Sequence, residues 1–421
     1  MAGIHTNSSS LRALEEEPTT VLPAYAASDA GQTGGIRLGI HQDGDITEVT
    51  TFLRARLARL GLADHVKRVE IGNDNGASVG FTFDRQCADR LAQQSDTSRL
   101  AERLHLESPT RRLDLETEIV VSLLLSPVEL RFASWADLTS SIRVRVNIVE
   151  AAREAQIEFR TDDAERPAEY WSYEEGRGFV LRHNQPLIPA IEAAIRPGAS
   201  GRLYSFSCWR ATEYIILLAI AREAERCNAD LLGRLTRQAE MRALKRDEFD
   251  RAFVQTYGSQ GQPLPVRFYI PGDRTWFRNP DRDSFEVDGY EGSFTFYLGA
   301  GRFSDFWKPG NTHSLRDKCV EIHCWREATY RDAEGMLRLD DRLAESLAER
   351  TSQHPALLNR ILDEMLQLQA PPGCFGGGCV EPTRDAPRSV VPPACTVDLP
   401  DAPEWPASEP DQAESEPCLA M

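Results

Sequence analysis

Hydrophobic residues recur along the chain with two different periods, which predict a mixture of helices and strands. Residues 47–62 carry hydrophobic side chains at helical spacing and predict an amphipathic helix. Segments 68–72 and 79–83 flank an Asn-Asp-Asn-Gly turn and predict a β-hairpin. Segments 115–125 and 142–148 are rich in Leu, Ile and Val, and both predict strands.

The second half of the chain continues this mixture. A helix is predicted at about 185–195, and a helix that is apolar on nearly every face, and hence buried, follows Cys208. Leucine-rich stripes at helical spacing predict two amphipathic helices, at 339–347 and 357–366. Strands are predicted near 266–270, 275–278, 293–298 and 319–325.

Composition divides the chain into four parts. Residues 1–45 are rich in Ser, Thr, Gly and Asp without a hydrophobic period, which predicts a disordered leader. Residues 46–165 predict an N-terminal α+β domain of unknown role, and residues 166–370 predict a second α+β domain that ends in helices. Residues 371–421 hold eleven prolines and nine acidic residues against two arginines, which predicts a disordered tail.

The net charge of −17 narrows the range of partners. An acidic protein repels nucleic acid and anionic membranes, and no apolar run approaches the ~20 residues of a membrane span. The nine cysteines are odd in number and scattered, which argues for a reducing compartment rather than a disulfide framework. We therefore expect a cytoplasmic protein without nucleic-acid or membrane partners, and leave open an export route that uses a polar leader.

Cys208 stands at the start of the predicted buried helix. A helix N-terminus stabilises a thiolate through its dipole and its unpaired N–H groups. The backbone N–H groups of Cys208 and Trp209 would also stabilise the oxyanion that forms during acyl transfer. A cysteine before an apolar helix is more often a buried structural residue, so this segment alone does not establish a nucleophile.

Three segments share a pattern with a known family. They are Trp171-Ser-Tyr-Glu-Glu, then Tyr204-Ser-Phe-Ser-Cys-Trp-Arg-Ala-Thr, then Pro271-Gly-Asp-Arg-Thr-Trp-Phe-Arg-Asn-Pro-Asp with the following Gly289-Tyr-Glu-Gly-Ser. In this order, over about 165–330, they resemble the Bacillus-type transglutaminases that cross-link spore-coat proteins. The resemblance implies an α+β fold with a papain-like or NlpC-like cysteine acyltransferase core. It also implies calcium-independent transfer of a protein glutamine's γ-glutamyl group to a lysine amine or to water, with no cofactor.

In that family a cysteine works with a glutamate. Carried over by motif, the nucleophile falls on Cys208 and the catalytic acid and base on Glu291. The family has an acidic residue directly before the cysteine, where this chain has Ser207, and a Gly-His-Gly stretch for which this chain offers no histidine until His313. A glutamate is a poor base for a thiol unless burial raises its pKa, so we expect a desolvated site.

Several other residues are weaker candidates for the site. Trp209, Trp171, Trp276 and Tyr290 are predicted to contribute to the oxyanion site or to the walls of a substrate channel, although ordinary core packing would explain each of them equally well. His313 and His323 are possible third members of the site, because imidazole titrates near neutral pH. Cys319, His323 and Cys324 lie close in sequence, but their spacing matches no zinc motif, so no metal is expected.

Two alternative functions stay open from the sequence. One is a papain-like or NlpC-like cysteine peptidase or amidase that uses His313 or His323 as its base. The other is a non-catalytic interaction protein on the same scaffold, which the serine at position 207 motivates. For the leading interpretation, the partners are protein substrates that bear glutamine and lysine.

Overall fold

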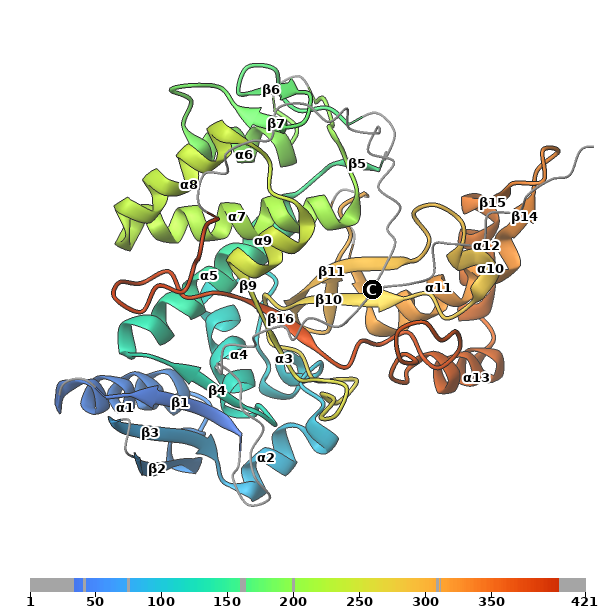
Figure 1. Cartoon of the computed structure of the whole chain (residues 1–421). Helices are drawn as coiled ribbons and strands as arrows, with labels where there is room; N and C mark the ends of the chain where they lie inside the picture. The colour runs from blue at the N-terminus through green and yellow to red at the C-terminus, as the bar shows by residue number, and fades with distance from the viewer. Residues whose placement is uncertain are drawn as a thin grey trace, which may run out of the picture.

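The architecture is taken from a computed structural model (Figure 1). The residues that it describes are 34–40, 43–73, 76–159, 164–198, 201–307, 310 and 312–400. Among these residues, no helix combines the length and hydrophobicity that a membrane-spanning segment requires.

A four-stranded sheet forms the N-terminal part, in the order β2 (Val66–Asn73), β3 (Gly76–Phe83), β1 (Gly35–Gly39), β4 (Glu129–Phe132). The predicted hairpin is confirmed, because β2 and β3 pair antiparallel in continuous register. The predicted first helix is confirmed as α1 (Asp43–Ala58). Since β1 lies inside this sheet, the prediction of a disordered leader to residue 45 is wrong for the described residues, and positions 1–33 lie outside them.

Segments 115–125 and 142–148 are helical, so the two strands predicted there are wrong. They lie in α4 (Arg112–Leu124) and α5 (Trp135–Glu154). Both helices are enclosed by other elements and buried on several faces, which removes the polar stripe that marks a surface helix. Even Arg145 of α5 is buried, where it forms an ion pair with Asp273 at 2.7 Å.

A six-stranded sheet occupies the centre of the molecule, in the order β13-β12-β11-β10-β16-β9. Its strands are β9 (Val254–Tyr257), β10 (Arg274–Arg278), β11 (Gly292–Gly299), β12 (Arg302–Ser304), β13 (Thr312–Ser314) and β16 (Arg384–Pro387). The strands predicted near 275–278 and 293–298 are therefore confirmed as β10 and β11. The predicted strand at 266–270 is wrong, because that segment forms turns.

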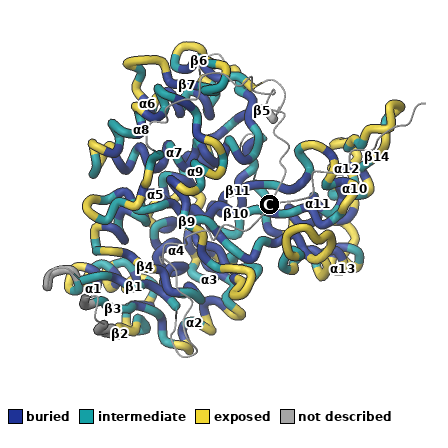
Figure 2. The backbone as a smooth tube through the Cα atoms, in the orientation of Figure 1, coloured by how far each residue is buried: buried dark blue, intermediate teal, exposed yellow. Residues whose placement is uncertain are grey.

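Helices cover both faces of this sheet. Phe296 and Leu298 of β11 belong to a core shared with α5 and α7 (Cys208–Cys227). Tyr297, between them, belongs to a second core shared with α11 (Leu315–Ala328) and α13 (Pro355–Met365). The strand β11 is therefore buried on both faces along almost its whole length, and Figure 2 shows the buried backbone concentrated here.

The remaining elements surround these two sheets. The helices predicted near 185–195, 339–347 and 357–366 are confirmed as α6, α12 and α13, whereas the strand predicted at 319–325 is wrong because it lies inside α11. The other bounds are α2 (Arg85–Leu91), α3 (Leu100–Leu104), β5 (Glu158–Phe159), β6 (Trp171–Glu174), β7 (Gly178–Leu181), α6 (Leu187–Ile195), β8 (Ser205–Phe206), α8 (Ala229–Met241), α9 (Arg246–Phe253), α10 (Arg282–Phe285), β14 (Thr329–Arg331), β15 (Leu337–Leu339) and α12 (Asp341–Ser352), with single 3₁₀ turns at Ala63–His65 and Gln93–Ser95.

Two of the predicted boundaries are not seen. One hydrophobic core contains side chains from Ile36 to Val397, and α5 packs along α7 across the boundary predicted near residue 165 (Figure 1). The prediction that residues 371–421 form a disordered tail is wrong up to residue 400, because β16 pairs with both β9 and β10. This strand could not be predicted because its sequence contains a proline and charged residues. Pro387 ends the strand, and the charged Arg384 is fully buried over the ring of Tyr269.

Candidate functional site

Cys208 is the first residue of α7. Ser207 caps the helix, because its Oγ accepts a hydrogen bond from the backbone N–H of Arg210 at 3.2 Å. Cys208 itself is half-buried, whereas Trp209 is only 3 % exposed. The serine at position 207 thus has a structural function that an acidic residue would also serve, since both side chains cap helices well.

The start of β11 lies against the Cys208 thiol. The backbone N–H groups of Phe294 and Trp209 both favour the ionised form of the sulfur and so lower the pKa of the thiol. Phe294 faces Trp276 across the β10–β11 ladder, with their ring centroids 4.5 Å apart. Gly292 leaves room for this pair, because an added Cβ would lie 2.4 Å from the Trp276 ring.

Opposing effects set the pKa of the Cys208 thiol. Burial of the sulfur raises the pKa most, and the negative charge of Glu291 raises it further. The N–H groups of Phe294 and Trp209 and the positive charge of Arg246 favour the thiolate. The net result is a raised pKa, so the resting group is a thiol, and a base would be needed to convert it to a thiolate.

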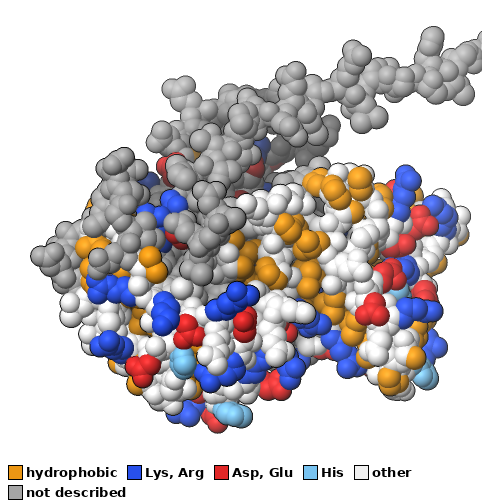
Figure 3. Space-filling model, turned by 90° about the horizontal axis from the view of Figure 1, so that it is seen from below, with side chains coloured by type: hydrophobic (Ala, Val, Ile, Leu, Met, Phe, Trp, Pro, Cys, Tyr) orange, Lys and Arg blue, Asp and Glu red, His pale blue; other side chains and the backbone are white. Residues whose placement is uncertain are grey.

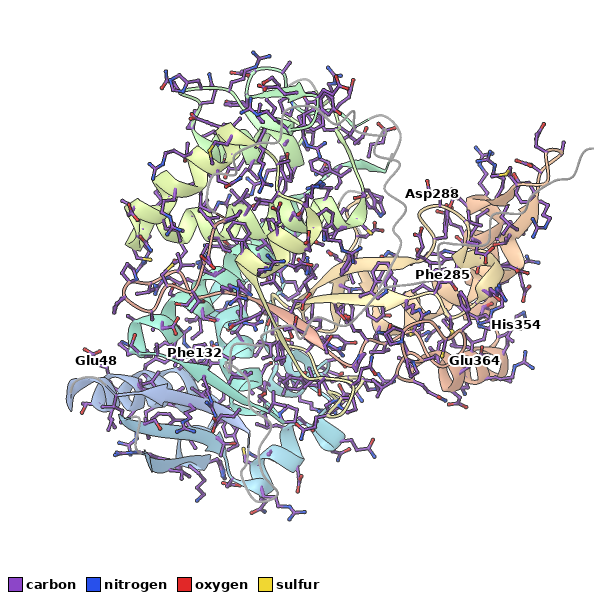
Figure 4. The ribbon with its side chains drawn as sticks, viewed as in Figure 1. Glu48, Phe132, Phe285, Asp288, His354 and Glu364 are labelled. Atoms are coloured by element: carbon purple, nitrogen blue, oxygen red, sulfur yellow. The ribbon has the colours of Figure 1, made fainter. Side chains whose placement is uncertain are left out.

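Glu291 lies within electrostatic reach of that thiol and is suited to accept its proton. The residue is 6 % exposed, and burial raises the pKa of its carboxyl group to about 7. Its own backbone N–H and that of Gly289 favour the carboxylate, while Asp288, in the loop between α10 and β11, adds to the rise (Figure 4). A carboxyl with a pKa near neutrality can both take and return a proton at physiological pH.

Comparison with known proteins adds to this geometry. The family of protein-glutamine gamma-glutamyltransferases matches residues 94–318, a segment that contains both Cys208 and Glu291. The chain belongs to this family. Because the match begins at residue 94, it includes α4 and α5, which the sequence interpretation had assigned to a separate domain.

Two relatives illustrate the match. A protein-glutamine gamma-glutamyltransferase of Halalkalibacterium halodurans is 28 % identical over 188 residues, which are 42 % of this chain and 58 % of that protein. The chain thus spans less than two thirds of the length of this curated relative. A transglutaminase from Geobacillus stearothermophilus, solved without its C-terminal extension, aligns with a TM-score of 0.35 and 19 % identity, covering 51 % of this chain and 96 % of that one.

The four aromatic candidates in this family member separate into two pairs. Trp209 adjoins Cys208 at the start of α7, and Trp276 packs against Phe294. The indole N–H of Trp209 is buried without a hydrogen-bond partner among the described residues. Trp171 packs on Tyr214 of α7 with ring centroids 5.6 Å apart, its indole N–H donates to the carbonyl of Ala190, and its ring belongs to the hydrophobic core. Its role in the channel walls stays a prediction.

Tyr290 adjoins Glu291 in sequence, but its side chain packs on the C-terminal helices. The hydroxyl donates to Asp341 of α12 at 2.5 Å, and the ring contacts Trp325 of α11 with centroids 5.2 Å apart. These contacts anchor the loop that carries Glu291, and the role of Tyr290 in the channel wall stays a prediction.

The two histidine candidates, His313 and His323, each lie near charged side chains other than Glu291. His313 Nε2 lies 3.0 Å from the carboxylate of Asp305 and 3.9 Å from that of Glu321. His323 lies on α11, where burial and then Arg326 lower the pKa of its imidazole. The charged groups with the largest effect on the Cys208 thiol are Glu291 and Arg246, neither of them a histidine.

Arg246 is the residue at the site that sequence reasoning missed. It begins α9, and its guanidinium carbon lies 5.7 Å from the ring centroid of Trp209 and 5.2 Å from that of Phe294. In the sequence it stands among Lys, Asp and Glu, as a residue on any exposed helix end would. No local signal distinguishes it.

The arrangement of charged side chains bears on metal binding and on the surface charge. Within the described part of the chain, no group of three or more His, Cys, Asp and Glu side chains is arranged to hold a metal ion. On the face shown in Figure 3, basic and acidic side chains are interspersed around hydrophobic ones. The net negative charge therefore does not form a surface of one sign on that face.

Proposed function

We propose that the protein is a calcium-independent protein-glutamine γ-glutamyltransferase that uses Cys208 as its nucleophile and Glu291 as its acid and base. The observation that carries this proposal is the meeting of the two groups at the N-terminus of α7. Burial there raises the pKa of Glu291 to about 7, and the backbone N–H groups of Phe294 and Trp209 favour the Cys208 thiolate. Family membership supports the choice of glutamine as the substrate group.

In the first half-reaction, the Glu291 carboxylate takes the proton of the Cys208 thiol. The sulfur then attacks the carbonyl carbon of the glutamine side chain, and the negative charge moves to the oxygen. N–H groups at the start of α7, with the unpartnered indole N–H of Trp209, are the candidate donors to that oxyanion. Glu291 returns its proton to the amide nitrogen, the C–N bond breaks, and ammonia leaves.

In the second half-reaction, a lysine amine attacks the thioester. Glu291 removes a proton from the attacking nitrogen, the C–S bond breaks, and the proton returns to the sulfur. The product is an amide between the two side chains. Water in place of the amine would yield glutamate, so the rings of Trp209, Trp276 and Phe294 support transfer by limiting the access of water to the sulfur.

We also propose that the core is papain-like. In such cores the nucleophilic cysteine begins a buried helix that packs on a sheet, and the base comes from that sheet. Here α7 packs on β11, and Glu291 directly precedes β11. A glutamate would thus occupy the place that a histidine holds in peptidases of this architecture.

Amine incorporation tests the proposal. The protein is incubated with a glutamine-rich protein and a fluorescent primary amine, in the presence of a calcium chelator. Incorporation should occur and should be lost in both Cys208→Ala and Glu291→Gln, while Glu175→Gln, at an exposed turn, should retain it. Hydrolysis that depends on His313 or His323 would instead favour a peptidase, and inactivity of the unaltered protein on many substrates would favour an interaction protein.

A further inference from the structure

Arg246 has a position that the proposed reaction does not yet use. Its guanidinium lies over the rings of Trp209 and Phe294, the two residues whose backbone N–H groups favour the Cys208 thiolate. The contact is thus made from a third element, α9, that approaches the site independently of α7 and β11. A cation held on aromatic faces keeps its charge while its position is fixed.

The charges around Arg246 leave it available to the thiol. Among the described residues it forms no salt bridge, whereas Arg210, which also contacts the Trp209 ring, is 2.9 Å from Glu213. Asp250, one turn further along α9, feels the charge of Arg246 but pairs with Arg274 at 2.7 Å. Arg246 is therefore the cation at the site whose charge is not taken up by a carboxylate contact.

We propose that the charge of Arg246 stabilises the Cys208 thiolate when the proton passes to Glu291. The proposal rests on the proposed transfer function and deepens it. Before the proton moves, the negative charge lies on the Glu291 carboxylate; afterwards Glu291 is neutral and the sulfur, whose charge Arg246 favours, is negative. Trp209 and Phe294 hold the guanidinium beside the position where this negative charge develops.

This arrangement also gives a physical reason for a function without an acidic residue at position 207. A carboxylate at position 207 would add a second negative charge beside the sulfur and so oppose formation of the thiolate. A site with that second carboxylate would need an additional positive charge. With Ser207 in that position, Glu291 is the carboxylate whose charge acts on the sulfur, and Arg246 is the side-chain cation that opposes it. Arg246 provides that cation from outside the motif.

Alkylation of Cys208 by iodoacetamide tests the proposal, because it reports the thiolate without requiring any glutamine substrate. Rates are followed between pH 6 and 10 by peptide mass spectrometry, with the exposed Cys374 of the same sample as the reference thiol. The variants are Arg246→Met, which keeps bulk without charge, and Arg246→Lys, which keeps charge. Arg251→Met, 73 % exposed on the same helix, is the matched control.

Arg246→Met should raise the apparent pKa of Cys208 alkylation and slow the reaction at pH 7.5 about tenfold, the size expected for loss of one neighbouring opposite charge. Arg246→Lys and Arg251→Met should stay within about twofold of the unaltered protein, and the rate at Cys374 should not change. Equal rates in Arg246→Met and the unaltered protein would overturn the proposal, as would equal losses in the Met and Lys variants. If Arg246→Met unfolds, Arg246→Gln is compared with Arg246→Lys under the same criteria. Failure of amine incorporation with a normal alkylation shift would count against the transfer function alone.

Discussion

Replacing Glu291 by glutamine should stabilise the protein at alkaline pH while it removes the activity. Burial raises the pKa of this carboxyl from 4.5 to about 7, which means that folding disfavours its ionised form. The folded protein then holds a proton that the unfolded chain releases between these two values. Stability contributed by this group is therefore lost as the pH rises from about 4.5 to 7, and the deficit is constant above 7.

The size of the effect follows from the shift. A change of about 2.5 pKa units corresponds to about 3.4 kcal/mol, at about 1.36 kcal/mol per unit. At pH 8.5 the unaltered protein carries nearly all of this cost, whereas at pH 5 it carries under about 1 kcal/mol. Glutamine cannot ionise, so Glu291→Gln should gain about 2.5 kcal/mol relative to the unaltered protein between pH 5 and pH 8.5.

Urea unfolding at pH 5 and pH 8.5 measures this difference. Comparison of two pH values cancels any constant effect of the amide on packing, and Glu175→Gln, in the exposed turn between β6 and β7, controls for the loss of a surface charge. Over the same range, kcat/KM for amine incorporation by the unaltered protein should fall about tenfold per pH unit below 7, because the base becomes protonated. The reasoning would be refuted if Glu291→Gln were no more stable at pH 8.5 than at pH 5, relative to the unaltered protein.

Three further predictions concern the surroundings of the site. Gly292→Ala should lower both amine incorporation and the melting temperature, at a cost of about 1–3 kcal/mol, because the new methyl group would displace the Trp276 ring; a melting temperature equal to that of the unaltered protein would contradict this. Asp305→Asn should destabilise the protein by about 2 kcal/mol at pH 6, since the hydrogen bond and charge of His313 overcome burial and hold the pKa of Asp305 at about 2. That loss should shrink as the pH falls from about 4 through 2, and urea unfolding across this range would reveal a constant loss if the ion pair were unimportant. A chain that ends at residue 382 lacks β16 and should fail to fold cooperatively by circular dichroism, whereas a chain ending at 400 keeps every described residue and should melt as the full chain does.

The local part of the site could be predicted from the sequence. An apolar run directly after Cys208 indicates a buried helix by hydrophobicity alone, and the helix start then sets the position of the sulfur. Glu291 required a resemblance in motif, because 83 residues separate it from Cys208 and nothing in the pattern of hydrophobic residues joins them. The motif position of Trp171 gave no indication of the direction of its ring, which packs in the hydrophobic core.

Enclosure was the main obstacle to predicting the fold. Alternating hydrophobic and polar residues, as in 142–148, predict a strand with one buried and one solvated face. The segment instead belongs to α5, which is so fully enclosed that even the polar position Arg145 is buried, paired with Asp273. The same property made β16 resemble a solvated tail, since Arg384 is a charged residue that the structure buries completely. In each case a long-range partner neutralises or covers a polar group that the local sequence presents as exposed.

Arg246 shows the consequence of this obstacle for function. A nucleophile and its base can be found by motif, because their chemistry restricts both residue type and local structure. A cation that acts electrostatically needs only to lie near the site. Any helix, strand or loop of the fold can place it there, so its position in the sequence is not restricted. Here α9 does so from a stretch in which every neighbouring residue is polar, and the rings of Trp209 and Phe294 hold the guanidinium once the chain has folded. Residues of this kind become visible through the packing around the sulfur, which is why the alkylation rate of Cys208, rather than any sequence pattern, decides whether Arg246 belongs to the site.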